Sequence, residues 1–273
     1  MNIYPPSALI SIAEKYLNDK IEQAQPLTQG DVSETFHIIT KNKKNYVIKN
    51  GASPQSEGKM LKFLASNGID VPKVILANSE ILILERIKET NSFSLETWSN
   101  LGKMLTKLHN IHNSNYGWED NYAFGTINVI NTPSSSWVKF WGEWRLACYL
   151  SHLPLTTAKK IEHLVIKLDD FLPDHPIASL LHGDLWTGNI LAHYNQPYLI
   201  DPACYYGHNE VDIAMLNLFG NPYDIFYQSY NLLEKGWQKR LAIYQIFPLI
   251  IHYILFGNYY LRMLNKILDD LKI

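Results

Sequence analysis

Three side chains that carry oxygen atoms place the strongest constraint on this chain. Asn189 lies five positions after Asp184, and Asp201 lies twelve positions after Asn189, directly after the apolar run Tyr198–Ile200. Carboxylate and amide oxygens are hard ligands of the kind that Mg²⁺ takes. The spacing therefore predicts a phosphoryl-transfer site for ATP, in which Asp184 orients an acceptor hydroxyl while Asn189 and Asp201 bind Mg²⁺.

The residues around Asp184 resemble the protein-kinase catalytic loop, H-R-D-x-x-x-x-N. Here the loop reads H-G-D-L-W-T-G-N, from His182 to Asn189. The H-G-D triplet is similar to the aminoglycoside-phosphotransferase and choline-kinase superfamily, and the longer string resembles the fructosamine kinase (ketosamine-3-kinase) family within it. A second block, from Asp201 to Gly220, extends the resemblance, which covers nearly the whole chain.

This resemblance implies an ATP-dependent kinase that phosphorylates a sugar hydroxyl of a ketosamine. Its acceptors would be fructosamines or ribulosamines, as small molecules or on glycated protein lysines, and its role would be protein deglycation. One alternative is a kinase of the same fold that acts on an aminoglycoside, choline or another sugar. A second is a non-catalytic nucleotide-binding scaffold, against which the complete set of Lys49, Asp184, Asn189 and Asp201 argues.

The resemblance also implies an α+β fold of the protein-kinase-like, two-lobed type. We expect a β-rich N-lobe over residues 1–87, a hinge connector at 88–93 and a mostly helical C-lobe over 94–273. The residue pattern agrees with this order. It predicts a first helix beginning near Ser7, a hairpin of strands 35–40 and 45–49, a helix over 55–66, strands over 71–77 and 81–87, a long loop over 111–133, and helices over 95–108, 135–151, 157–171 and from 210 onward.

Several N-lobe residues are candidates for nucleotide binding. Lys49 ends an apolar strand, as the lysine of V-A-I-K does, and Glu57 is its expected partner. The turn that contains Gly30 and Ser33 would cover the phosphates, although it holds one glycine where G-x-G-x-x-G has three. Two further residues, Glu85 and Ile87, precede the connector and are expected beside the adenine.

Aromatic and charged residues of the C-lobe are candidates for the acceptor pocket, because aromatic faces stack on sugars and on the apolar side of amines. These candidates are Trp186, Trp141, Arg145, Tyr205 and His208. Two other residues, His182 and Asp212, are expected to support the catalytic loop.

Composition excludes several classes of protein. A net charge of −2 gives no basic surface for nucleic acid. No H-E-x-x-H or C-x-x-C pattern indicates zinc, and two cysteines cannot make a disulfide framework. Polar residues interrupt the apolar region from Ile246 to Leu264, which favours buried helices over a membrane span. With no signal peptide visible, we expect a cytoplasmic monomer.

Overall fold

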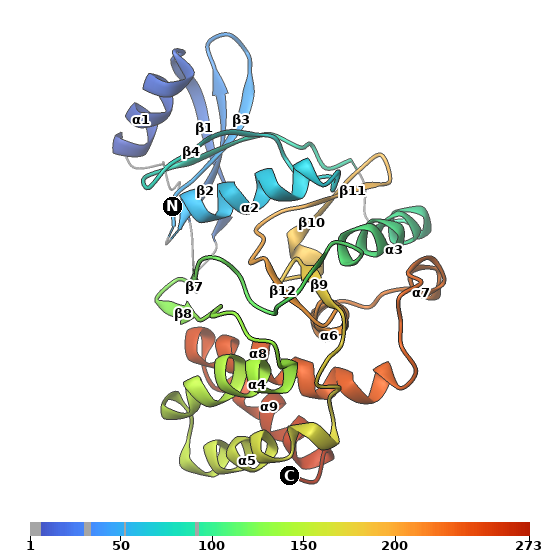
Figure 1. The fold of residues 1–273 in the computed structure, drawn as a ribbon. Helices are drawn as coiled ribbons and strands as arrows, with labels where there is room; N and C mark the ends of the chain where they lie inside the picture. Colours follow the sequence, from blue (N-terminus) through green and yellow to red (C-terminus); the bar gives the residue numbers. More distant parts are fainter. Residues whose placement is uncertain (1–6, 30–33, 52, 91–92) are drawn as a thin grey trace.

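The computed structural model describes residues 7–29, 34–51, 53–90 and 93–273. A β-sheet with two helices forms the N-terminal part, and a larger, mostly helical part follows it (Figure 1). This arrangement confirms the predicted α+β fold class. The expected connector at 88–93 falls between the last strand of the sheet and the next helix, and in this interval residues 86–90 and 93–94 contain neither helix nor strand.

The N-terminal sheet has five antiparallel strands in the order β1-β2-β3-β5-β4. Its strands are β1 (Ile21–Gln29), β2 (Glu34–Thr40), β3 (Asn45–Lys49), β4 (Val74–Ala77) and β5 (Leu82–Glu85). Along β2 the side chains alternate, so that Phe36 and Ile38 are buried beneath helix α1 (Ser7–Leu17). Helix α2 (Pro54–Ser66) covers another part of the sheet and places Met60 against the helical part.

The helical part contains longer helices and several short irregular ones. They are α3 (Leu95–His109), α4 (Trp137–Trp141), a π-helix (Gly142–Leu146), three 3₁₀ helices (Ala147–His152, Leu168–Asp170 and Thr187–Asn189), α5 (Leu155–Ile166), α6 (Glu210–Phe219), α7 (Asp224–Ser229), α8 (Trp237–Phe256) and α9 (Asn258–Asp270). Short strands run between them: β6 (His112–Asn113), β7 (Tyr122–Phe124), β8 (Ile127–Val129), β9 (Ala178–Leu181), β10 (Ile190–His193), β11 (Gln196–Leu199) and β12 (Tyr205–Gly207).

Most predicted elements are present, with three differences. Strand β1 was not predicted, and the expected loop at 111–133 contains the strands β6, β7 and β8. The helix expected over 135–151 is one helical segment that changes from α to π to 3₁₀ geometry. Because a π-turn holds one more residue than an α-turn, the side chains after Gly142 are rotated relative to a regular helix.

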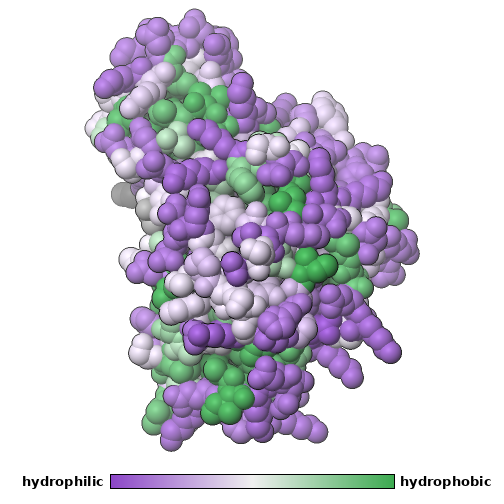
Figure 2. Space-filling model, in the orientation of Figure 1, coloured by the Kyte–Doolittle hydropathy of each residue, from purple (hydrophilic) through white to green (hydrophobic). Residues whose placement is uncertain are grey.

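Helix α8 is long and apolar enough, by length and composition alone, to cross a membrane. The core helices of soluble proteins can have the same length and composition. In this protein α8 packs against α6 and α9 and contributes Ile246, Leu249 and Ile250 to the main apolar core. On the face shown in Figure 2, apolar side chains form patches between polar ones.

Candidate active site

The catalytic-loop candidates follow strand β9 directly. Gly183 has a φ of +82°, which is the left-handed region that favours glycine. A Cβ atom on Gly183 would lie 2.0 Å from the backbone oxygen of Ala203, so the loop also needs the space that glycine leaves. The backbone N–H of Ala203 donates to the oxygen of His182 at 2.8 Å. The loop is thereby fixed to the segment that carries Asp201.

Asp212, in the first turn of α6, holds the same loop from behind. Its buried carboxylate accepts hydrogen bonds from the backbone N–H groups of His182, at 2.7 Å, and Gly183, at 2.9 Å. Nε2 of His109 lies 3.1 Å from the same carboxylate. These contacts are the ones that the predicted supporting role of Asp212 requires.

His182 is held in one orientation by its two ring nitrogens. Its Nε2 lies 2.9 Å from the carbonyl oxygen of Ile200, and a carbonyl can only accept, so Nε2 donates. Nδ1 is left to accept from the N–H of Asp184 at 3.3 Å. Burial lowers the pKa of His182, which keeps the ring neutral, as this pattern needs. His182 thus joins Asp184 to the segment before Asp201.

Asp184 and Asn189 form a pair at the two ends of the loop. The Asn189 amide donates to the backbone oxygen and to Oδ2 of Asp184, both at 2.9 Å. No hydrogen bond of the described residues uses Oδ1 of Asn189, so this oxygen is free to bind a cation. Burial raises the pKa of Asp184 to about 7, and the nearby carboxylates of Asp201 and Asp212 add to this effect.

Lys49 joins the sheet to the helical part. Its Nζ lies 2.9 Å from Oε2 of Glu57 and 2.8 Å from Oδ1 of Asp201. Burial disfavours the charge on Lys49, but the two carboxylates more than offset this and raise its pKa. Burial likewise raises the pKa of Glu57 to about 7. Asp201 has a φ of +55°, and its side chain is 40% exposed toward the cavity.

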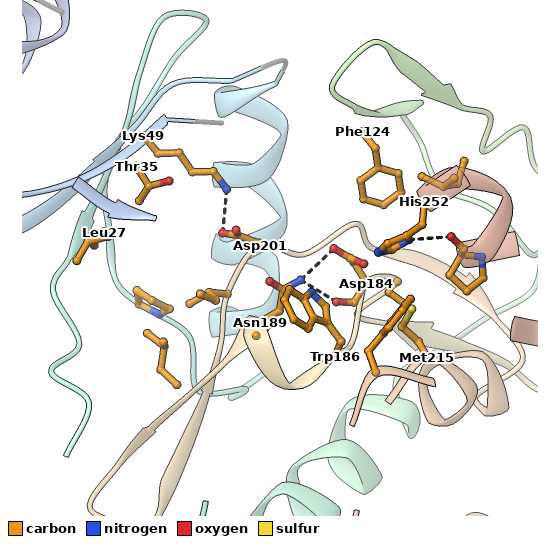
Figure 3. A pocket seen from close by; sticks show the side chains of 18 of the residues that line it. Leu27, Thr35, Lys49, Phe124, Asp184, Trp186, Asn189, Asp201, Met215 and His252 are labelled. Atoms are coloured by element: carbon orange, nitrogen blue, oxygen red, sulfur yellow. Dashed lines mark hydrogen bonds and ion pairs between the residues drawn. The ribbon is translucent and has the colours of Figure 1, made fainter. Parts of the chain in front are cut away.

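A cavity of about 780 Å³ contains Lys49, Asp184, Asn189 and Asp201 in its wall (Figure 3). On the side of the sheet its wall also includes Thr35, Val47, Leu84, Glu85 and Ile87. Asn189 and Asp201 supply the hard oxygens that Mg²⁺ prefers, and Lys49 supplies a cation for phosphate, so the residues fit both groups. Gly30 and Ser33 lie outside the described residues.

The opposite side of the cavity, which we call the helical side, is formed by Phe124 of β7, by Trp186 and by residues of α6, α8 and α9. Of the residues that we predicted for the acceptor pocket, Trp186 lines this side. Its side chain lies beside Asn189 and is 39% exposed.

Three other acceptor candidates, Trp141, Arg145 and Tyr205, are not brought to the cavity. All three are buried in the core of the helical part. The guanidinium of Arg145 donates to the oxygen of Ile130 and to Oδ1 of Asn131, each at 2.6 Å, and lies against the Tyr205 ring. These contacts make Arg145 a packing and loop-anchoring residue, in place of the acceptor contact we predicted.

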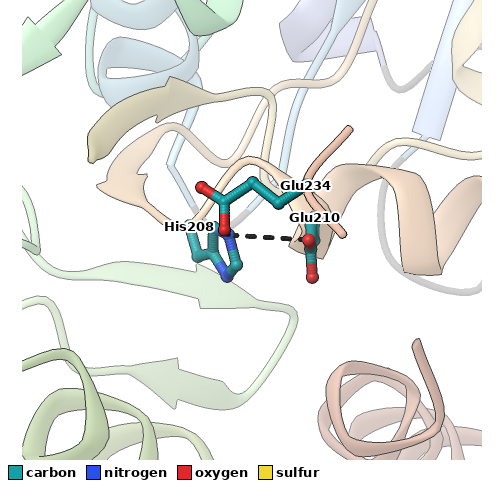
Figure 4. A group of neighbouring side chains, drawn as sticks. All are labelled: His208, Glu210 and Glu234. Carbon is teal, nitrogen blue, oxygen red and sulfur yellow. Dashed lines mark ion pairs between the residues drawn. The ribbon is translucent and has the colours of Figure 1, made fainter. Parts of the chain in front are cut away.

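His208 also lies outside the cavity wall, in a polar cluster with the buried Glu210 and the exposed Glu234 (Figure 4). Its Nε2 is 3.8 Å from Glu210 and 4.0 Å from Glu234, and its Nδ1 is 2.7 Å from the hydroxyl of Tyr244. Arg240 binds both carboxylate oxygens of Glu210, at 2.7 and 2.5 Å. The cluster therefore already has its positive charge, and an added metal ion would have to compete with Arg240.

His252, which the sequence analysis did not select, lines the helical side. Its Nδ1 lies 2.7 Å from the oxygen of Pro248 and must donate to it, and the lone pair of Nε2 has no partner among the described residues. The Phe219 ring stacks on it, with 4.6 Å between the centroids. Burial lowers the pKa of His252, so the neutral ring is an acceptor. Its position in the apolar second half of α8 was the available signal.

Sequence comparisons with known proteins point to one family of kinases. A family model described as fructosamine kinase matches residues 7–273. A protein of Synechocystis, named a probable ketoamine kinase, is 30% identical over 92% of this chain and 90% of its own length. The chloroplastic protein-ribulosamine 3-kinase of Arabidopsis thaliana is 34% identical over 62% of this chain and 56% of its own.

Solved structures show the same fold. A Thermobifida fusca protein whose assignment as a fructosamine-3-kinase is provisional has a TM-score of 0.87 and 26% identity, with 96% of this chain and 97% of that chain covered. The amicoumacin kinase hAmiN has a TM-score of 0.67 at 16% identity and covers 98% and 93% of the two chains. The second likeness concerns the fold alone, which is shared by kinases with different acceptors.

Proposed function

This chain belongs to the fructosamine kinase family, and we propose that, as an ATP-dependent kinase of ketosamines, it works through the residues that meet at the cavity. The observation that carries this proposal is the convergence of Lys49, Asp184, Asn189 and Asp201 on one space. They come from two parts of the chain and bring together a cation, a buried carboxylate and free oxygen ligands.

Asp184 is the proposed catalytic residue. It accepts a hydrogen bond from the acceptor hydroxyl and orients that oxygen toward the γ-phosphorus of ATP. The new bond joins this oxygen to phosphorus, the bond between the γ-phosphorus and the bridging oxygen breaks, and ADP leaves. The hydroxyl proton passes to Asp184. Because Asn189 and His182 fix the loop at both ends, Asp184 is already oriented before the substrate arrives.

The remaining residues hold the nucleotide. Lys49 binds the phosphates, and Glu57 and Asp201 keep it in position. Mg²⁺, bound by Asn189 and Asp201, would neutralise charge that develops on the phosphate oxygens. Glu85, at the end of β5, and Ile87 line the cavity, which supports the proposal that they lie beside the adenine.

The acceptor is a ketosamine of the fructosamine or ribulosamine type, formed on a small amine or on a lysine of a glycated protein. The name of the Arabidopsis relative supports the ribulosamine, and the family description supports the fructosamine. Phosphorylation of such adducts in the cytoplasm fits a role in deglycation.

An ADP-release assay with fructosamines, ribulosamines, an aminoglycoside, choline and free sugars tests this function. We expect turnover of at least one ketosamine. Asp184→Asn should lower kcat by at least about 1000-fold, which is within the range seen when a catalytic side chain is removed. The affinity for a non-hydrolysable ATP analogue should stay unchanged. Asp169→Asn, at an exposed position, is the matched control. Turnover of another alcohol with none of any ketosamine would refute the function.

A further inference from the structure

The helical side of the cavity is apolar over most of its wall. Met215 and Phe219 reach it from α6, Ile251 and Phe256 from α8, and Tyr260 from α9. Trp186 closes it next to Asp184 (Figure 3). An acceptor whose hydroxyl lies at Asp184 must extend its remaining atoms along this wall, because the nucleotide takes the side of the sheet.

Charge is nearly absent from this wall. Among its described residues, Asp184 is the acidic side chain, and none is a lysine or an arginine. Of the other charged residues of the cavity, Glu85 ends β5 and Arg86 and Glu89 follow it. Lys49 and Asp201 pair with each other at the proposed phosphate and metal site. A carboxylate bound against the helical side would therefore lose water without gaining a cation, and a second ammonium group would find no free carboxylate.

Two groups on the helical side suit the one charge that every ketosamine carries. Its secondary ammonium is adjacent to the sugar and so stays near the reacting hydroxyl. The face of Trp186 and the free Nε2 of His252 can both interact with that ammonium. Phe256 and Tyr260, whose ring centroids lie 5.4 and 4.9 Å from that of His252, add only aromatic surface and one phenol.

Resting on the proposed function, we infer that this enzyme selects ketosamines whose amine carries an uncharged hydrocarbon chain. Adducts on the α-amino group of free amino acids are disfavoured by their carboxylate. Adducts of polyamines, and aminoglycosides themselves, are disfavoured by their additional ammonium groups. The amine portion, rather than the sugar alone, then determines which acceptors are used.

A panel that varies only the amine tests this inference. One ketose is attached in turn to hexylamine, benzylamine, glycine, glutamate and putrescine, and kcat/KM is measured for each adduct. We expect the two neutral chains to exceed the carboxylate and diamine adducts by at least about tenfold, the lower range for discrimination by a desolvated site. Equal kcat/KM across the panel would overturn the inference and leave the proposed function intact. Turnover of no ketosamine would overturn both.

A charge introduced at Phe256 gives a second readout. Phe256 lines the cavity and is 39% exposed, so a lysine is tolerated there by the fold. Phe256→Lys should raise kcat/KM for the glycine and glutamate adducts relative to hexylamine by several-fold. Tyr259→Lys, at a position that is 60% exposed and outside the cavity wall, adds the same charge and should leave the ratio unchanged. A ratio that responds equally to both variants would count against selection by this wall.

Discussion

Buried charged and polar residues in this protein are positioned by partners that use up some of their atoms and leave others free. The amide of Asn189 donates both N–H groups to Asp184, so its oxygen points away from Asp184. The ring of His252 donates a hydrogen bond from Nδ1 to Pro248, and Nε2 stays available in the cavity wall. In each residue, the atom without a partner among the described residues is the one that a ligand can use.

His208 is expected to make stability depend on pH. Burial, together with Arg240 and His109, lowers its pKa to about 3, against an ordinary value of 6.5. Between these values the unfolded chain binds the proton and the folded chain does not, so stability is lost as pH falls below 6.5. Between pH 6.5 and 5 this loss is about 2 kcal/mol.

Glu210, Glu234 and Tyr244 face the same ring and are present in both proteins. Their effects on stability therefore cancel when the wild type is compared with a variant that lacks only the imidazole. The difference in free energy of unfolding between the wild type and His208→Gln should therefore shift by about 2 kcal/mol against the wild type between pH 6.5 and 5. His163→Gln, at an exposed position, is the matched control. Denaturant titrations at both pH values measure this, and a constant difference would refute the assignment.

Arg145 is expected to stabilise the fold without binding the acceptor. Arg145→Lys removes the second hydrogen bond of the planar guanidinium and its stacking on Tyr205, at a cost of about 2 kcal/mol or more. Thermal or denaturant unfolding measures the loss, while KM for the acceptor should stay within twofold for the folded enzyme. Arg262→Lys on the exposed face of α9 is the control. A large rise in KM at unchanged stability would restore the acceptor role.

Sequence reasoning identified the residues whose spacing is tied to chemistry and was less successful with the aromatic residues. Asp184, Asn189 and Asp201 share a motif, so their meeting in one cavity could be predicted. Trp141 and Arg145 stand one turn apart, which places them on one helix face but does not say what covers that face. Here α8 covers it, through Tyr244 and Phe247. Because aromatic residues line pockets and also fill cores, the sequence alone does not tell the two positions apart.

At the scale of elements, the catalytic loop depends on how closely β9 and the segment before β12 approach each other. Gly183→Ala adds a methyl group at 2.0 Å from the Ala203 oxygen as well as the strain of a positive φ. We expect a loss of more than about 2 kcal/mol in stability and a fall in kcat, because Asp184 must shift with the backbone.

Gly236 provides a matched control for Gly183. Its φ is +84°, but a Cβ atom there would meet only the end of the Arg240 side chain, at 3.6 Å. Gly236→Ala should therefore cost about 1 kcal/mol from φ alone and leave kcat unchanged. Unfolding and ADP-release measurements on both variants separate the two effects. Equal behaviour of the two glycines would mean that the contact with Ala203 is unimportant.

Elements with a strong local signal were predictable, and elements formed by pairing alone were not. The hairpin of β2 and β3 alternates apolar side chains around a polar turn, and it was predicted. Strand β1 is largely polar and contains Pro26, so its own sequence does not indicate a strand. Its pairing with β2, which shifts register near Pro26, forms it. The short strands β6 to β8 likewise depend on partners distant in sequence or on a tight hairpin.

At the scale of the whole molecule, the proposed active site lies where the sheet and the helical part meet. Helix α2 packs Met60 against Cys204, and the backbone N–H of Leu199 donates to the oxygen of Asp70. Lys49 and Asp201 make the polar contact inside the cavity. We propose that residues 88–93 are the boundary between the two parts, since the chain passes there from the sheet to α3. Nucleotide bound at this junction would contact both parts at once.

Lys49 and Lys59 both connect the two parts by an ion pair, and they should differ sharply in function. Lys49 is buried between Glu57 and Asp201, whereas the pair of Lys59 with Asp120, at 3.2 Å, is exposed on both sides. Lys49→Met removes the cation that we assign to the phosphates, so kcat/KM for ATP should fall at least about 100-fold, or about 2.7 kcal/mol. Lys59→Met loses an exposed ion pair, worth less than about 1 kcal/mol, and should stay within about threefold. ADP release at varied ATP measures both, and a similar small loss for the two variants would show that Lys49 only joins the parts together.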